Sequence, residues 1–141
     1  KEVAERMAAA PGSKTYGILS VLIQAWYHVD YLFTVHEHVF NPPPKVKSAV
    51  IRMTRNQTES LGCDETLFKK VVKTCFNQRR KTMRNSIKPL FADADQRKLQ
   101  KGEGVKDHTA FLQKEIFNKR PEQLSVNDFI ELTNMVDQEL S

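Results

Sequence analysis

Only two segments of this chain have the composition of β-strands, and this limits the folds open to it. Residues 29–35 and 46–53 are rich in β-branched and aromatic side chains that roughly alternate in polarity. The loop between them contains Pro42, Pro43 and Pro44, which hold the backbone in an extended path. Because two strands alone do not form a stable sheet, the pair is expected to need a neighbouring sheet that this sequence does not supply.

The rest of the chain is dominated by apolar residues at helical spacing. Helices are expected over residues 1–10, over 19–27 with Ser20 as N-cap, over 64–76 after Asp64, over 83–91, and over 125–140 after a capping box of Ser125 and Asp128. Residues 92–107 are charged and contain glycine, so they are expected to form a loop or a loose helix. The aromatic residues expected in the core are Trp26, Phe68, Phe76 and Phe129.

Size and composition exclude several classes of protein. The chain has 141 residues, 40% of them hydrophobic, which suits one compact domain or the end of a larger protein. It contains no apolar run of the ~18 residues that a membrane span needs. It begins at Lys1 without an initiator Met or a secretory signal, so its natural start is expected to be missing. Two cysteines cannot form a disulfide framework, which favours a reducing, cytoplasmic setting.

Positive charge is concentrated in one segment. The whole chain carries a net charge of +5, yet residues 69–88 alone carry +8, and no Asp or Glu lies between Thr66 and Ala92. A solvated helix face explains such a run about as well as a phosphate-binding surface does. The mixture of guanidinium, amide and hydroxyl donors favours contacts with nucleic-acid phosphate and sugar. These donors include Arg79, Arg80, Lys81, Arg84 and Asn85. On either view the charges are expected at the surface, so replacing them should hardly affect folding.

Most catalytic and metal-binding patterns are absent. The sequence has no P-loop, GxGxxG, HExxH or catalytic triad spacing. His36 and His38 lack a third ligand nearby, so no metal site is expected. Phe40 is different, because the three prolines after it form a rigid support. The ring could pack inward as an anchor for the loop, or face outward as a platform on which a nucleobase stacks.

Three motifs give the chain a specific resemblance. These are residues 16–20 (Tyr-Gly-Ile-Leu-Ser), residues 40–50 (Phe-Asn-Pro-Pro-Pro-Lys-Val-Lys-Ser-Ala-Val) and residues 76–86 (Phe-Asn-Gln-Arg-Arg-Lys-Thr-Met-Arg-Asn-Ser). Together with Arg-Pro-Glu-Gln-Leu-Ser at residues 120–125, they closely resemble the bacterial ribosomal RNA adenine N6,N6-dimethyltransferases of the KsgA (RsmA) type, which are related to the Erm methyltransferases.

The resemblance implies an α+β fragment of two parts. Residues 1–57 would be the tail of a Rossmann-like methyltransferase domain, with helices plus an antiparallel strand pair, and residues 58–141 would form a small all-α rRNA-binding domain. The intact enzyme would transfer methyl groups from S-adenosylmethionine to the N6 amines of two adjacent adenosines in the 3′-terminal hairpin of small-subunit rRNA. Its partner would be that rRNA or a 30S subunit precursor.

The resemblance also assigns roles to individual residues. Phe40 would stack the flipped target adenine, and Lys45, with the donors of residues 79–85, would hold the RNA backbone. The cofactor loop and the acceptors for the target amine lie upstream in the family, so no S-adenosylmethionine is expected to bind this chain and the chain alone is expected to be inactive. Self-association through the uncovered sheet edge is a further expectation. The alternative is a non-catalytic RNA-binding or ribosome-assembly module.

Overall fold

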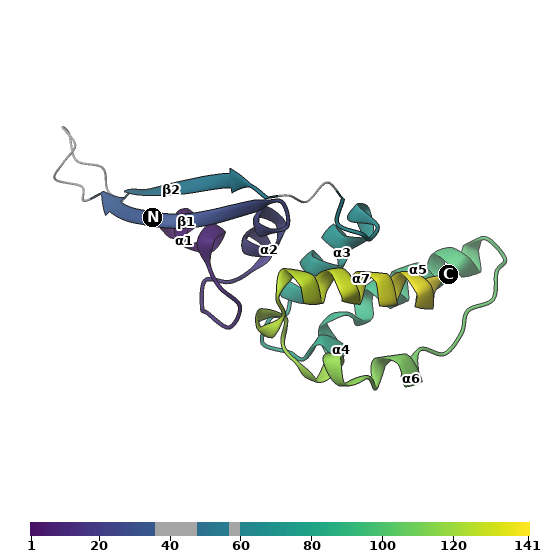
Figure 1. Cartoon of the computed structure of the whole chain (residues 1–141). Helices are drawn as coiled ribbons and strands as arrows, with labels where there is room; N and C mark the ends of the chain where they lie inside the picture. Colours follow the sequence, from purple (N-terminus) through teal and green to yellow (C-terminus); the bar gives the residue numbers. More distant parts are fainter. Residues whose placement is uncertain (36–47, 57–59) are drawn as a thin grey trace. The chain divides into compact units, whose positions relative to one another are not determined.

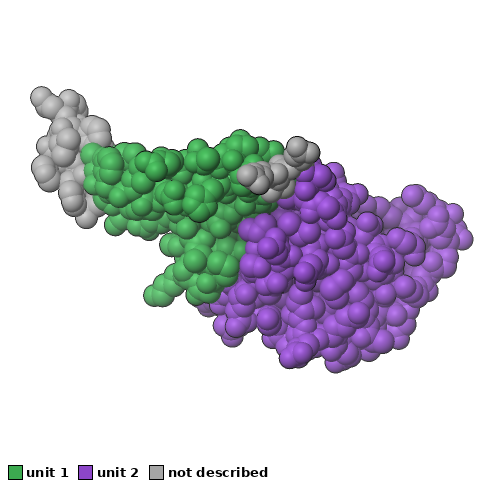
Figure 2. Space-filling view, in the orientation of Figure 1, with its two compact units in different colours: residues 1–59 green, residues 60–141 purple. Residues whose placement is uncertain are grey.

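The computed structural model describes residues 1–35, 48–56 and 60–141 (Figure 1). Phe40, Lys45, the two histidines at 36 and 38, and the predicted domain boundary after residue 57 lie outside these residues. The chain divides into two compact units, residues 1–59 and residues 60–141 (Figure 2). The first unit contains both strands, and every described element of the second is helical, so the chain is α+β.

The first unit is a strand pair with two short helices. Helices α1 (Glu2–Ala8) and α2 (Ile18–Gln24) precede strands β1 (Tyr27–Val35) and β2 (Ser48–Arg55). The strands pair antiparallel from Tyr27 opposite Arg55 to Val35 opposite Ser48, with an irregularity between Tyr31 and Phe33. β1 begins two residues before the predicted start and β2 ends two residues after the predicted end, because backbone pairing continues past the apolar stretch that the sequence pattern detects.

Three details of this unit differ from the sequence prediction. The helix expected over residues 19–27 ends at Gln24, and Tyr27 is instead the first residue of β1. Ser20 is not the N-cap of its helix, because α2 begins at Ile18 with Gly17 as N-cap. Ser20 is instead buried, where its Oγ accepts a hydrogen bond from the Gly17 N–H at 3.1 Å and donates to the carbonyl of Arg6. Trp26 is half-buried rather than in the core. Among the residues of this unit that the structure describes, those that are buried are Ala9, Tyr16, Ser20, Val21 and Ala25.

The sheet of this unit is open. No residue of β1 or β2 is buried in the part of the chain that the structure describes. Several large apolar side chains are exposed on the strands: Tyr27, Leu32, Phe33, Val50 and Met53. Helices α1 and α2 contact the strands, but a sheet with no fully buried residue has little hydrophobic stabilisation of its own, as expected for two strands that lack neighbours.

The second unit is a cluster of helices around one apolar core. Its elements are α3 (Glu65–Phe76), α4 (Met83–Ser86), α5 (Lys88–Gln100), α6 (Thr109–Leu112), the 3₁₀ helices η2 (Glu115–Asn118) and η3 (Pro121–Gln123), and α7 (Val126–Leu140). Helices α3 and α7 pack against each other, with the rings of Phe76 and Phe129 5.8 Å apart. The fully buried residues include Phe68, Val71, Met83, Ile87, Phe117, Leu124, Phe129 and Leu132.

The predicted caps of the two long amphipathic helices are confirmed. Asp64 Oδ1 accepts a hydrogen bond from Leu67 N at 2.9 Å, and Ser125 and Asp128 form the reciprocal capping box. The buried residues of α7 are Phe129, Leu132, Thr133 and Val136, while Ile130 is only half-buried.

The predicted helix over residues 83–91 is two helices. α4 ends at Ser86 and α5 begins at Lys88, with Pro89 in its first turn. Proline has no N–H to continue the hydrogen-bond ladder of α4, so the chain changes direction there. α5 then continues to Gln100, which makes the helix alternative right for residues 92–100, and Gly102 at φ +77° lies just beyond its end. None of the helices in the described residues is long and apolar enough to cross a membrane.

Candidate nucleic-acid interface

The candidate interface is the turn between α3 and α4, residues 77–82, with the first turn of α4. α3 ends after Phe76 with Asn77 as its C-cap, and Lys81 N donates to the carbonyl of Gln78 at 2.9 Å. Thr82 is the N-cap of α4, whose Met83 is fully buried. The turn is thus anchored at both ends by core residues, Phe76 on one side and Met83 on the other. This rigid support positions the basic side chains between them.

The five predicted RNA-contacting residues of this segment fall into two groups. Arg80, Lys81 and Asn85 are exposed. Arg79 and Arg84 instead contact acceptors within the unit. The Arg79 Nη2 lies 3.1 Å from Glu122 Oε2, and its guanidinium lies over the ring of Phe76 at 5.9 Å. Arg79 is thereby held against η3 by a partly exposed ion pair.

Arg84 joins α4 to the last residue of α6 and the last residue of η2. Its Nε donates to the carbonyl of Leu112 at 2.8 Å, and its Nη2 donates to Asn118 Oδ1 at 2.6 Å. The neighbouring Met83 N–H donates to the carbonyl of Lys119 at 2.7 Å. These contacts argue against the expectation that replacing Arg84 hardly affects folding, because its guanidinium satisfies two acceptors from distant parts of the sequence.

These contacts bring a second basic segment beside the first. Lys114, Lys119 and Arg120 are exposed, and the Met83–Lys119 backbone hydrogen bond places Lys119 next to the start of α4. Sequence analysis missed this segment because 31 residues lie between Thr82 and Lys114, and only tertiary contacts reveal that the two segments are neighbours.

The described residues offer little to other kinds of chemistry. In residues 1–35, 48–56 and 60–141, no group of three His, Cys, Asp or Glu side chains could hold a metal ion. Burial raises the pKa of the Cys75 thiol to about 12, against a hydrogen bond with Ser86 that lowers it, so this thiol stays protonated and is not a nucleophile. The basic surface is the feature of the second unit that best suits an anionic polymer.

Comparison with known proteins identifies the family. The family model for ribosomal RNA adenine dimethylase matches residues 1–128. A ribosomal RNA small subunit methyltransferase A of Bacteroides thetaiotaomicron is 69% identical over 140 residues, which cover 99% of this chain and 47% of that protein. One from Cytophaga hutchinsonii is 55% identical over 136 residues, covering 96% of this chain and 47% of that protein.

Solved structures share the fold. A dimethyladenosine transferase from Plasmodium falciparum has a TM-score of 0.80 at 23% identity, over 99% of this chain and 56% of that one. The 23S rRNA methyltransferase ErmE has a TM-score of 0.50 at 20% identity, over 94% of this chain and 51% of that one. The chain therefore has the fold of part of an rRNA methyltransferase. It belongs to the ribosomal RNA adenine dimethylase family and spans about half the length of the curated relatives it matches.

Proposed function

We propose that this chain is the C-terminal part of an enzyme that dimethylates the N6 amines of two adjacent adenosines in the 3′-terminal hairpin of small-subunit rRNA. The observation that carries the proposal is the match of residues 1–128 to the adenine dimethylase family, together with relatives named as small-subunit rRNA methyltransferases. In this proposal residues 1–57 are the tail of a Rossmann-like catalytic domain, and residues 58–141 are an rRNA-binding domain. The partner is small-subunit rRNA, in the cytoplasm, within a 30S precursor.

The open sheet supports the assignment of the first unit to a larger domain. Its strands expose Tyr27, Leu32, Phe33, Val50 and Met53, and burying such side chains is favourable by ~25 cal/mol per Å² of apolar surface. In the intact enzyme the remainder of the catalytic domain would cover this sheet. In the isolated chain, a second copy could pair with it, since unpaired strand edges recruit other chains.

We propose that the S-adenosylmethionine site lies outside the described residues. Gly12, Gly62 and Gly102 have positive φ but stand singly, and no glycine-rich loop joins a strand to a helix in the described part of the chain. We therefore assign the cofactor, which would supply the methyl group, to the half of the relatives that this chain does not span. The residues present would position the RNA.

Arg80 and Lys81 are the residues that test rRNA docking. Their replacement by Gln is expected to weaken binding to a small-subunit rRNA fragment containing the 3′-terminal hairpin. Each lost phosphate contact should also make log K less steep against log salt by up to ~0.9, because fewer counterions are released. Binding is measured at several salt concentrations, beside the melting temperature. Arg79 and Arg84 are left intact because they make intramolecular contacts.

A matched variant removes the same charge elsewhere. Lys98 and Lys101 lie at the end of α5, and their double replacement by Gln should leave the salt slope nearer to that of the parent chain. Arg80→Lys keeps the charge but loses the bidentate guanidinium, so a partial defect indicates forked phosphate contacts. Unchanged affinity and slope in the Arg80 and Lys81 double variant would show that the turn is a solvated surface and that docking lies elsewhere.

Phe40 tests the proposed stacking of the target base. In the intact enzyme, Phe40→Ala is expected to reduce methyl transfer about 5- to 150-fold, because a base stacked on an aromatic ring gains ~1 to 3 kcal/mol. Phe40→Tyr and Phe40→Trp should retain most of the activity, since both keep a ring. The measurement is the single-turnover rate on rRNA. A lower melting temperature with an unchanged rate would instead identify Phe40 as an anchor of its loop.

A further inference from the structure

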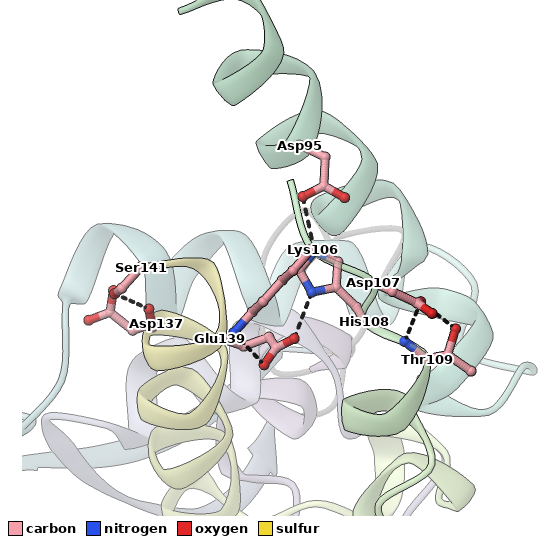
Figure 3. Close-up of polar contacts among 8 residues, drawn as sticks. All are labelled: Asp95, Lys106, Asp107, His108, Thr109, Asp137, Glu139 and Ser141. Atoms are coloured by element: carbon pink, nitrogen blue, oxygen red, sulfur yellow. Dashed lines mark hydrogen bonds and ion pairs between the residues drawn. The ribbon is translucent and has the colours of Figure 1, made fainter. Parts of the chain in front are cut away.

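A histidine in the second unit lies between two carboxylates from different helices. His108 precedes α6, and its Nε2 is 2.9 Å from Asp95 Oδ1 on α5, while its Nδ1 is 2.7 Å from Glu139 Oε2 on α7 (Figure 3). The imidazole also packs against the ring of Phe91, at 4.8 Å between centroids. Only 10% of the His108 side chain is exposed.

The two hydrogen bonds define the protonation state of the ring. A carboxylate only accepts hydrogen bonds, so each ring nitrogen must donate, and only the doubly protonated imidazolium has two N–H groups. A neutral ring would turn a lone pair toward one of the carboxylates, which is repulsive. The geometry is therefore that of a charged His108 joining α5 to α7.

The other charged groups at this site come from the segment before α6. Lys106 Nζ lies 3.2 Å from Glu139 Oε1, so Glu139 pairs with two cations. Asp107 Oδ1 accepts from both the backbone N–H and the hydroxyl of Thr109 (Figure 3). With His108 protonated, Asp95 and Glu139 are balanced by His108 and Lys106. Loss of the ring proton leaves one negative charge in excess.

We propose that His108 is a pH-sensitive latch, which holds α5, the segment before α6 and α7 together while its ring is doubly protonated and releases Asp95 when the ring loses one proton. Glu139 is the partner that stays, because it has the shorter contact and keeps Lys106. Asp95 is also the more exposed carboxylate, at 27% against 14%. Water can replace the ring most easily at Asp95.

The titration of the ring has a defined sign. Burial disfavours the charged ring, but the hydrogen bonds to Asp95 and Glu139 outweigh it and raise the pKa of His108 above its ordinary value of 6.5. The hydrogen bond from His108 in turn lowers the pKa of Glu139, against the effect of burial. The stabilisation from charged His108 is thus complete below pH 6.5 and is lost as the pH rises through the raised value.

Backbone amides at the end of α5 report the state of the latch. The N–H groups of Lys101, Gly102 and Glu103 donate to carbonyls of the last turn of α5, which follows Asp95. In the 141-residue chain, their protection from hydrogen exchange, corrected for intrinsic rates, should fall about tenfold between pH 6 and pH 9, the effect of losing one charged hydrogen bond. Constant protection over this range would overturn the proposal.

Two variants separate the latch from general stability. In the Asp95→Asn variant, the side-chain amide can accept a hydrogen bond from the charged ring through its oxygen. After a flip, its NH₂ group can donate to the neutral ring. The exchange protection of the α5 backbone amides should therefore stay high at every pH. In His108→Gln it should be low at every pH. If the His108→Gln variant does not fold, the Asp95→Asn variant still tests the latch. A tenfold fall of its amide protection with pH, like that of the parent chain, would refute the mechanism. His28→Gln is the control: it removes a histidine of the first unit, and the protection of the α5 amides should fall with pH as it does in the parent chain.

This inference is independent of the proposed rRNA docking. The latch uses Asp95, Lys106, His108 and Glu139, and none of them belongs to the docking turn. Loss of rRNA affinity in the Arg80 and Lys81 variant therefore leaves the latch experiment unaffected. Constant protection of the α5 amides would likewise leave the docking proposal intact.

Discussion

Replacing Arg84 with Gln is expected to lower the free energy of unfolding of the helical unit by about 2 kcal/mol. The change removes charge-assisted hydrogen bonds to the carbonyl of Leu112 and to Asn118. Hydrogen bonds to charged groups contribute ~1.5 to 3 kcal/mol each, and the partial exposure of this site reduces their sum. For a unit of this size, the melting temperature should fall by about 10 °C.

Matched variants distinguish the geometry of Arg84 from its charge. Arg84→Lys keeps the charge, but one ammonium cannot reproduce the planar fork that reaches both acceptors, so it should recover only part of the stability. Arg80→Gln, which removes an exposed guanidinium four residues away, should change stability by less than ~0.5 kcal/mol. Thermal unfolding followed by circular dichroism measures all three. Equal melting temperatures for Arg84→Gln and Arg80→Gln would rule out the structural role of Arg84.

Local signals in the sequence were sufficient to predict where the two long amphipathic helices begin. Asp64 and Ser125 start α3 and α7 as predicted, since a cap and its acceptor lie within three residues of each other. The break at Ile87 was missed because the apolar stripe runs through Pro89 without interruption. The N-cap of α2 was predicted at the wrong residue, because a sequence pattern cannot distinguish a serine that is buried from a serine that caps a helix.

The functional residues were harder to predict, because their partners are distant in the sequence. Arg79, Arg80 and Arg84 belong to one uniformly basic run, yet Arg80 is exposed whereas Arg79 and Arg84 are half-buried. Arg79 and Arg84 differ from Arg80 because they have acceptors within the unit. These acceptors, Glu122, Leu112 and Asn118, lie 28 to 43 residues further along the chain. The contacts of His108, to residues 13 and 31 positions away, have no local signature either.

Phe129→Ala is expected to have the largest effect on the fold. Phe129 is fully buried and packs against Phe76, the last residue of α3. Removing a buried phenylalanine side chain costs ~3 to 5 kcal/mol, which is a large fraction of the ~5 to 15 kcal/mol that stabilises a typical domain. The melting temperature of the helical unit should fall by at least ~12 °C.

The same substitution should also weaken rRNA docking, because Phe76 fixes the point at which α3 ends and the basic turn begins. Phe33→Ala is the matched control: it removes the same side chain from a residue that is 55% exposed, where no packed core is lost. Affinity for the rRNA fragment is measured well below the melting temperature of each variant. If Phe129→Ala melts as Phe33→Ala does, the contact between α3 and α7 does not hold the unit together. If it melts early but binds rRNA as the parent chain does, the turn does not depend on this core.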